Sequence, residues 1–137
     1  MSSLLVDTNL WIYAIDRDSQ FFFKAQTLLF ESEFDLFTTS KNHSEFLAVV
    51  TRSENLPLSI PLALEVIQDI SAICTTLYPN SHTFKTFKNL LAKYQPRGLK
   101  IHDFEIASIG IGHGISRLAT VNRRDFAAIE EIEIVLL

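Results

Sequence analysis

Four acidic residues and one amide are the side chains of this 137-residue sequence best suited to chemistry: Asp7, Glu45, Asp103, Asn122 and Asp125. Asp7 directly follows one short apolar run, and Asn122 and Asp125 follow another. Carboxylates that converge on one site repel each other, which raises their pKa values. A divalent cation relieves that repulsion, and Mg²⁺ prefers oxygen ligands while it keeps several waters. If the chain brings these residues together, the sequence predicts a divalent-metal site.

Each member of this set also has a purely structural explanation. Asp7 could close a turn after its strand, and Glu45 could pair with Asn42 as a capping box. Asp103 could be a helix N-cap, and Asp125 could cap the short turn that follows it. The metal-site interpretation therefore depends on the whole set rather than on one residue.

The elements that must position these residues alternate between strands and helices. The predicted strands are Leu4–Val6, Asp35–Thr38, Thr75–Tyr78, Arg117–Val121 and Ile132–Leu136. The first three predicted helices begin at Trp11, cover Phe21–Glu31, and run to about Thr51 with Thr39 or Ser40 as the cap. The next three open with Ser59 as cap and Pro61 in the first turn, run from Ser81 towards Pro96, and cover Phe104–His113 with Asp103 as the cap. This alternation indicates an α/β domain with a mostly parallel sheet covered on both faces. Ligands of such sheets gather at the carboxyl ends of the strands.

Small residues in the last predicted helix indicate that it packs closely against the sheet. They are Ala107, Ser108, Gly110 and Gly112, and Gly114 fits the end of that helix. A turn is predicted over residues 55–59. Three consecutive phenylalanines, at positions 21–23, cannot all face one small core, so we expect at least one on a partner-covered surface.

Length and composition favour one folded domain over residues 1–137. Nearly half of the residues, 47%, are hydrophobic, which argues against disorder. No apolar run is long enough to cross a membrane, and the start lacks the pattern of a secretory signal. A single cysteine, Cys74, excludes an internal disulfide and a cysteine zinc site. We therefore expect a cytoplasmic protein.

The charges are unevenly distributed, although the formal net charge is −4. Residues 1–80 contain ten acidic and four basic side chains, whereas residues 81–102 contain five basic and no acidic ones. A basic surface beside an acidic site suits a protein that acts on a phosphate backbone. The candidate substrate contacts are Lys85, Lys88, Arg97 and Arg123. The alternative is an ordinary solvated helix face.

Four motifs in order resemble the PIN-domain family, and in particular VapC-like toxin ribonucleases. The motifs are Leu-Val-Asp-Thr-Asn at residues 5–9, Ser-Glu-Phe-Leu at 44–47, Ile-His-Asp-Phe at 101–104, and Thr-Val-Asn-Arg-Arg-Asp-Phe at 120–126. Each motif alone is weak, but four in order within 137 residues are fairly specific. The resemblance implies a three-layer α/β/α, Rossmann-like fold with a central sheet of four to five strands.

The resemblance also implies roles for individual residues. Asp7, Glu45 and Asp103 would be the main ligands of Mg²⁺ or Mn²⁺. Many relatives have an acid where this chain has Asn122, so Asp125 is the expected fourth ligand, and whether one or two metals bind stays open. Thr8, Asn9, Thr120 and Asn122 would orient the carboxylates through hydrogen bonds.

The function implied is hydrolysis of RNA phosphodiester bonds by a metal-activated water, without a covalent intermediate. The resemblance further implies a homodimer and a separate antitoxin that blocks the acidic groove. The alternatives are a PIN nuclease of RNA processing without an antitoxin, and an inactive binding module of the same fold. A Rossmann nucleotide binder is disfavoured, because no glycine-rich loop follows the first strand.

Overall fold

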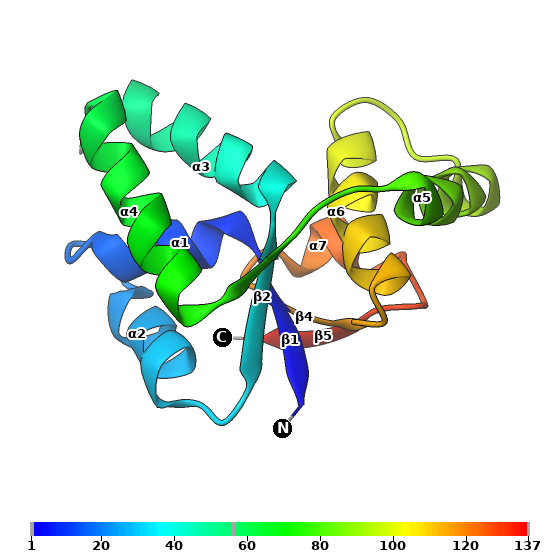
Figure 1. Cartoon of the computed structure of the whole chain (residues 1–137), viewed down its shortest axis with the longest axis horizontal. Coiled ribbons are helices and arrows are strands. Elements are labelled where there is room, and N and C mark those ends of the chain that lie inside the picture. The colour runs from blue at the N-terminus through cyan, green and yellow to red at the C-terminus, as the bar shows by residue number, and fades with distance from the viewer. Residues whose placement is uncertain (1, 56, 137) are drawn as a thin grey trace.

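The computed structural model describes residues 2–55 and 57–136, and it places a five-stranded sheet between two layers of helices (Figure 1). The strands are β1 (Ser3–Val6), β2 (Asp35–Thr39), β3 (Thr75–Leu77), β4 (Arg117–Thr120) and β5 (Glu133–Leu136). The helices are α1 (Thr8–Ile15), α2 (Phe22–Glu31), α3 (Ser40–Arg52), α4 (Ile60–Ile73), α5 (Ser81–Tyr94), α6 (Lys100–Gly112) and α7 (Arg123–Phe126). The order β3-β2-β1-β4-β5 has parallel neighbours throughout. The α/β prediction with a three-layer arrangement is confirmed.

The central strands are apolar on both faces because helices cover both sides of the sheet. In β1, Leu4 and Val6 belong to the core under α1–α4, whereas Leu5 belongs to the core under α5–α7. In β4, Ala119 and Leu118 divide between the two cores in the same way. This two-sided burial explains why these strands read as continuous apolar runs rather than as an alternating pattern.

Side-chain caps set the starts of several helices. Thr39 caps α3, and its hydroxyl accepts the Asn42 backbone N–H while the Asn42 side chain accepts the Thr39 backbone N–H. The alternative in which Asn42 and Glu45 form the capping box is therefore wrong. Thr39 stays extended as the last residue of β2, so the position three residues into the helix belongs to Asn42 and not to Glu45.

The predicted start of α3, with Thr39 or Ser40 as its cap, is confirmed, but two predicted helix starts were wrong. Asp7 caps α1, which begins at Thr8 rather than Trp11. α6 begins at Lys100, where backbone hydrogen bonds to Gly98 and Leu99 form its first turn without any side-chain cap. Asp103 is therefore not the N-cap of this helix but lies inside its first turn.

Asp125 does not cap the turn that follows it, because it lies within α7. The two structural explanations for Asp103 and Asp125 thus fail. Asp7 has a local structural role, but as the cap of α1 rather than as the turn that was the alternative to a metal role. That role involves one carboxylate oxygen and leaves the other for a different partner.

Two glycines of α6 allow close packing, as their positions predicted. A Cβ at Gly110 would lie 2.9 Å from Leu5 Cδ2, so this turn of the helix lies directly on β1. A Cβ at Gly112 would lie 2.7 Å from Thr83 Cγ2, so this turn lies against α5 instead of the sheet. Gly114 follows with a φ of +82°, a conformation that ends the helix and that other residues rarely adopt.

The predicted turn at residues 55–59 includes Leu56, which lies outside the described residues. Within residues 2–55 and 57–136, no helix has both the length and the apolar character needed to cross a membrane. Of the three consecutive phenylalanines, Phe23 is 79% exposed, and its being covered by a partner stays a prediction.

Candidate functional site

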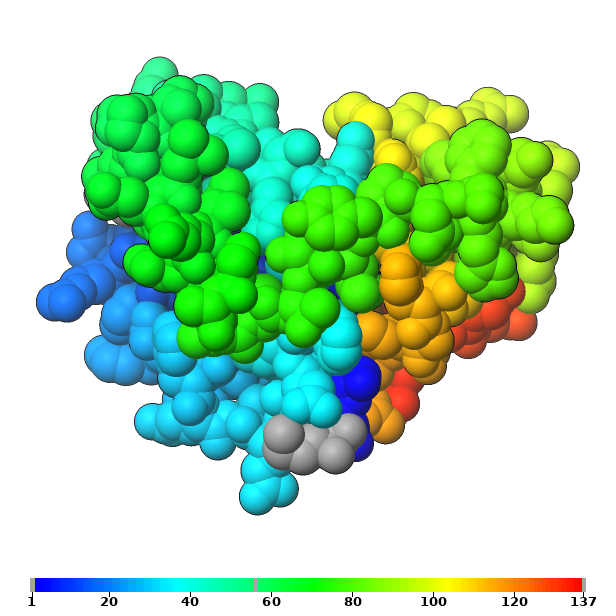
Figure 2. All heavy atoms as spheres, viewed as in Figure 1, coloured from blue at the N-terminus to red at the C-terminus, as the bar shows by residue number. Residues whose placement is uncertain are grey.

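A cleft of about 270 Å³ lies at the carboxyl edge of the sheet. Its lining combines residues from the β1–α1 junction, α3, α6 and the segment after β4: Asp7, Thr8, Asn9, Glu45, Ala48, Val49, Arg52, Asp103, Asn122 and Asp125. The space-filling view shows a notch between the lobe that contains α3 and α4 and the lobe that contains α5 and α6 (Figure 2). All four carboxylates singled out in the sequence therefore line the same cleft.

Asp7 is held by hydrogen bonds to both of its carboxylate oxygens. Its Oδ1 accepts the Thr8 backbone N–H at 2.8 Å, and its Oδ2 accepts the Thr120 hydroxyl at 2.8 Å. The Thr120 Oγ1 itself accepts the Asn122 backbone N–H at 3.0 Å. Because that N–H can only donate, the one hydroxyl hydrogen of Thr120 points to Asp7. The neighbouring strand ends β1 and β4 thus fix this carboxylate.

Glu45 lies in α3 and is held from the β1–α1 junction. Its Oε2 accepts the Thr8 hydroxyl at 3.0 Å. Thr8 is therefore a bridge between Asp7 and Glu45, since its backbone N–H serves one and its hydroxyl serves the other. The predicted orienting roles of Thr8 and Thr120 have hydrogen bonds to match, while Asn9 and Asn122 line the cleft without such bonds to a carboxylate among the described residues.

Asp103 and Asp125 face the same cleft from α6 and α7, with a different environment. Within the described part of the chain, neither side chain has a hydrogen-bond partner or an ion pair within 4 Å. Burial raises the pKa of Asp103 to about 7, and the negative charges of Asp125, Asp7 and Glu45 add to that rise. Lys100 opposes it.

The pKa of Asp7 is raised to about 6, mainly because this side chain is buried. The hydrogen bonds from Thr120 and from the Thr8 backbone lower it, while Glu45 and Asp125 raise it further. The electrostatic influence of these carboxylates on one another shows that the cleft is a site of concentrated negative charge. A single cleft with several acids at raised pKa is typical of functional sites.

The chemistry of this donor set fits a hard divalent cation. Across residues 2–55 and 57–136, no three His, Cys, Asp or Glu side chains stand close enough to ligate one ion together. Mg²⁺ does not require such a cage, because it keeps several waters and takes one or two carboxylates directly. The mutual repulsion recorded in the raised pKa values is relieved when a cation enters.

Arg52 is a cleft residue that the sequence interpretation missed. It lies on the same face of α3 as Glu45, seven positions later, with Ala48 and Val49 between them. Helical spacing from Glu45 would have found it. Its side chain is exposed, and no ion pair to it occurs within the parts of the chain that are described. Val49 is half-buried and lines the cleft beside it.

The predicted substrate contacts lie outside the cleft lining. Lys85 and Lys88 are exposed on α5, where the Lys88 Nζ lies 5.1 Å from the centre of the Phe84 ring. Arg97 is exposed in the loop after α5, and Arg123 is exposed at the start of α7, next to Asn122. None of these four residues is therefore part of the cleft wall.

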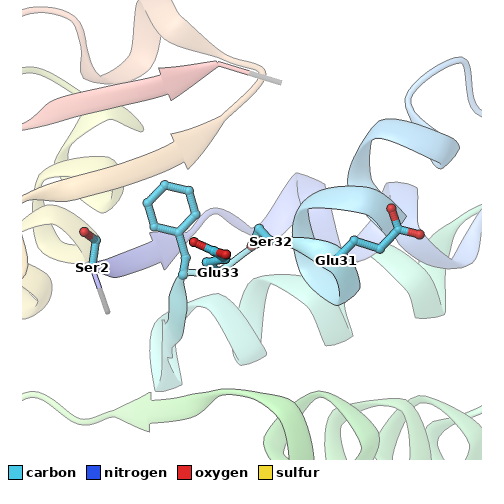
Figure 3. Close-up of a pocket in the computed structure, with 5 residues that line it drawn as sticks. Ser2, Glu31, Ser32 and Glu33 are labelled. Atoms are coloured by element: carbon cyan, nitrogen blue, oxygen red, sulfur yellow. The ribbon is translucent and has the colours of Figure 1, made fainter.

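A larger hollow of about 550 Å³ offers a comparison at the far end of β1. It is lined by Ser2, Glu31, Ser32, Glu33 and Phe34. Figure 3 shows that the carboxylates of Glu31 and Glu33 point apart. Without convergent polar groups, this hollow offers no arrangement for catalysis.

Residues 4–132 match the family model described as the PIN domain. The chain belongs to the PIN-domain family. This assignment confirms the resemblance that the four motifs indicated. No curated protein sequence matches the chain.

Several solved toxin–antitoxin structures share the fold of this PIN domain. VapBC2 from Rickettsia felis, bound to a DNA fragment from its promoter, matches with a TM-score of 0.74 and 17% identity over 98% of both chains. VapC20 from Mycobacterium tuberculosis, described as a toxin that cleaves the Sarcin-Ricin loop, matches with a TM-score of 0.73 and 14% identity over 93% of this chain and 95% of that one. DNA-bound VapBC from Salmonella typhimurium matches with a TM-score of 0.70 and 21% identity over 99% and 98%.

Proposed function

We propose that this PIN domain is a metal-dependent endoribonuclease and the toxin of a toxin–antitoxin pair. The observation that carries the proposal is the convergence of Asp7, Glu45, Asp103 and Asp125 on one cleft, with the pKa raised to about 6 at Asp7 and to about 7 at Asp103. A bound Mg²⁺ or Mn²⁺ would supply an activated water and neutralise the phosphate charge.

The four carboxylates would hold the ion, either directly or through its waters. Asp7 and Glu45 are already oriented by Thr8 and Thr120. Asp103 and Asp125 lack such partners in the described residues, so we propose that they adjust to the ion when it binds. Asn9 and Asn122, which line the cleft, would contact waters or the substrate.

RNA is the proposed substrate, and basic residues would hold its backbone. Arg52 offers a guanidinium inside the cleft that could pair with a phosphate, a geometry that arginine favours. Lys85, Lys88, Arg97 and Arg123 would extend this contact along the strand outside the cleft. The M. tuberculosis structure that shares the fold is described as cleaving an RNA loop, which supports RNA over other phosphodiesters.

The proposed partners are an antitoxin protein and a second copy of this chain. Structures that share the fold are described as VapBC or toxin–antitoxin complexes, which supports an antitoxin. The homodimer rests on the family resemblance alone. A cytoplasmic location would suit an enzyme that meets cellular RNA.

The proposal is tested by incubating the purified protein with structured RNAs in the presence of Mg²⁺, Mn²⁺ or EDTA. We expect internal cleavage that requires the metal and disappears in the Asp103→Asn variant. Co-expression with the protein encoded by the adjacent open reading frame should suppress the cleavage. Metal-dependent cleavage without suppression would leave a nuclease and remove the toxin role. No cleavage and no metal binding would favour an inactive binding module.

A further inference from the structure

A buried chain of hydrogen bonds lies behind Glu45. The Asn42 side chain, only 1% exposed, approaches Thr8 so that its Nδ2 lies 2.9 Å from the Thr8 Oγ1. The Thr8 Oγ1 lies 3.0 Å from the Glu45 Oε2. On its other side, the Asn42 Oδ1 accepts the Thr39 backbone N–H at 3.2 Å and the Thr39 hydroxyl at 2.6 Å.

The direction of every bond in this chain follows from groups that can only donate. The Thr39 backbone N–H must meet an acceptor, so the Asn42 amide oxygen faces Thr39 and its NH₂ group faces Thr8. The Thr8 Oγ1 therefore accepts from Asn42. Its single hydroxyl hydrogen is then left for Glu45, which accepts it.

We infer that Asn42 is a positioning residue for the acidic cleft, because it forces the Thr8 hydroxyl to donate to Glu45. The inference rests on the proposed function and deepens it. Glu45 receives a hydrogen-bond donor on Oε2, which holds its side chain in the cleft. Across residues 2–55 and 57–136, the Glu45 Oε1 has no hydrogen-bond partner and is free to meet an ion or its water.

Asn42 also completes the capping box of α3, so its two roles must be separated. An aspartate at position 42 keeps the oxygen that Thr39 needs but has no NH₂ group to offer to Thr8. The Thr8 hydroxyl would then face two carboxylates with one hydrogen. Asn42→Asp therefore preserves the N-cap of α3 but no longer forces the Thr8 hydroxyl to donate its hydrogen to Glu45.

The experiment compares Asn42→Asp, Thr8→Val and the double variant with the wild type, with Mn²⁺ affinity and RNA cleavage measured for each. Groups that orient a metal ligand typically contribute about 10–100-fold to affinity or activity. We expect each single variant to lose Mn²⁺ affinity and kcat within that range, with KM for RNA changed less than about twofold. The double variant should lose no more than the worse single variant, because both remove the same bond. Thr8→Ser, which keeps the hydroxyl, should restore wild-type values.

Two controls separate this inference from other effects. Ser44→Asp adds the same charge at an exposed neighbouring position of α3 and should leave activity and affinity unchanged. A crystal structure of metal-free Asn42→Asp should show the Thr8 hydroxyl turned away from Glu45, with α3 still beginning at Ser40. Retention of the Thr8–Glu45 bond in that structure, or losses that multiply in the double variant, would overturn the inference. A wild-type protein that neither binds Mn²⁺ nor cleaves RNA would instead overturn the proposed function, and the crystal structure would still test the hydrogen-bond direction.

Discussion

The two halves of the acidic cleft are built in opposite ways. Asp7 and Glu45, at the β1–α1 junction and on α3, accept hydrogen bonds from Thr8 and Thr120. The other half, on α6 and α7, carries its two carboxylates without such donors in the described residues. Hydrogen bonds therefore hold the carboxylates of the first half, and none holds those of the second half among the described residues.

The pKa values show what this difference does. Asp7 is almost fully buried and Asp103 only half-buried, yet the pKa rises to about 6 for Asp7 and to about 7 for Asp103. Burial alone would give the reverse order. Hydrogen bonds from Thr120 and Thr8 lower the pKa of Asp7 against the effect of burial, whereas Asp103 has no such donor among the described residues. Burial raises the pKa of both carboxyl groups, and hydrogen-bond donors oppose that rise only at Asp7.

The largest loss of RNA cleavage should come from Asp7→Asn, which replaces the carboxylate that accepts hydrogen bonds from both Thr8 and Thr120. Asparagine is as good an N-cap as aspartate, so α1 should form and the melting temperature should change little. Metal-dependent RNA cleavage should fall by more than the roughly 100-fold that marks the upper range for groups that only orient a ligand. Single-turnover cleavage rates and thermal denaturation measure the two. Activity close to that of the wild type would exclude Asp7 as a ligand.

Removal of one donor should have the next largest effect. Thr120→Val keeps the buried shape but deletes the hydrogen bond to Asp7, so the pKa of Asp7 should rise above about 6. We expect a loss of about 10–100-fold in cleavage, with recovery in Thr120→Ser. Thr86→Val, at a half-buried position of α5 outside the cleft, serves as a control for the loss of a hydroxyl. Equal cleavage activity in Thr120→Val and in the wild type would mean that the hydrogen bond from Thr120 does not orient Asp7 for the reaction.

Arg52→Ala tests the positively charged side chain that lines the cleft, and it should have a smaller effect on cleavage. If its guanidinium binds a substrate phosphate in the ground state and the transition state alike, KM should rise by up to about tenfold, or about 1.4 kcal/mol, while kcat stays nearly constant. Arg52→Lys should recover part of the loss. Arg17→Ala, at an exposed position outside the cleft, should have no effect. A fall in kcat with unchanged KM would contradict this role.

The pH dependence of stability should show the smallest effect. Acids whose pKa is raised in the folded state favour folding below their unfolded pKa of 3.8, and this contribution is lost as pH rises through about 6 for Asp7 and about 7 for Asp103. In EDTA, the free energy of unfolding should therefore fall between pH 4 and pH 7. Urea titrations should show a weaker pH dependence for Asp103→Asn. A pH dependence equal to that of the wild type would contradict the electrostatic repulsion between Asp103 and the other carboxylates of the cleft.

Much of the fold could be predicted from the sequence, because the strands are short apolar runs and most helices have local caps. The wrong start predicted for α6 has a physical cause. The first turn of α6 is made by backbone hydrogen bonds to Gly98 and Leu99, without a capping side chain that the sequence could reveal. Asp103 was therefore taken for the cap. The α3 capping box was misplaced because β2 runs one residue further than its apolar pattern, up to Thr39.

The convergence of the four carboxylates could be predicted because their motifs occur in order along the sequence. Not all of the hydrogen-bond donors to these carboxylates could be predicted. The hydrogen bond between Thr120 and Asp7 joins residues 113 positions apart, and it depends on the pairing of β1 with β4. The link from Asn42 to Thr8 likewise depends on how α3 lies against α1. Arg52 could have been predicted from its helical spacing to Glu45. Hydrogen-bond donors that are distant in sequence can be found only from the three-dimensional structure.

The central claim is that carboxylates of both halves share one cation site. Equilibrium titration with Mn²⁺, followed by the electron paramagnetic resonance signal of the free ion, tests it in the wild type, Asp7→Asn, Asp103→Asn and the double variant. We predict that a substitution in either half weakens binding by at least about tenfold, or 1.4 kcal/mol. We also predict that the double variant binds no ion at the cleft. Wild-type affinity in Asp103→Asn together with a loss in Asp7→Asn would contradict a shared site.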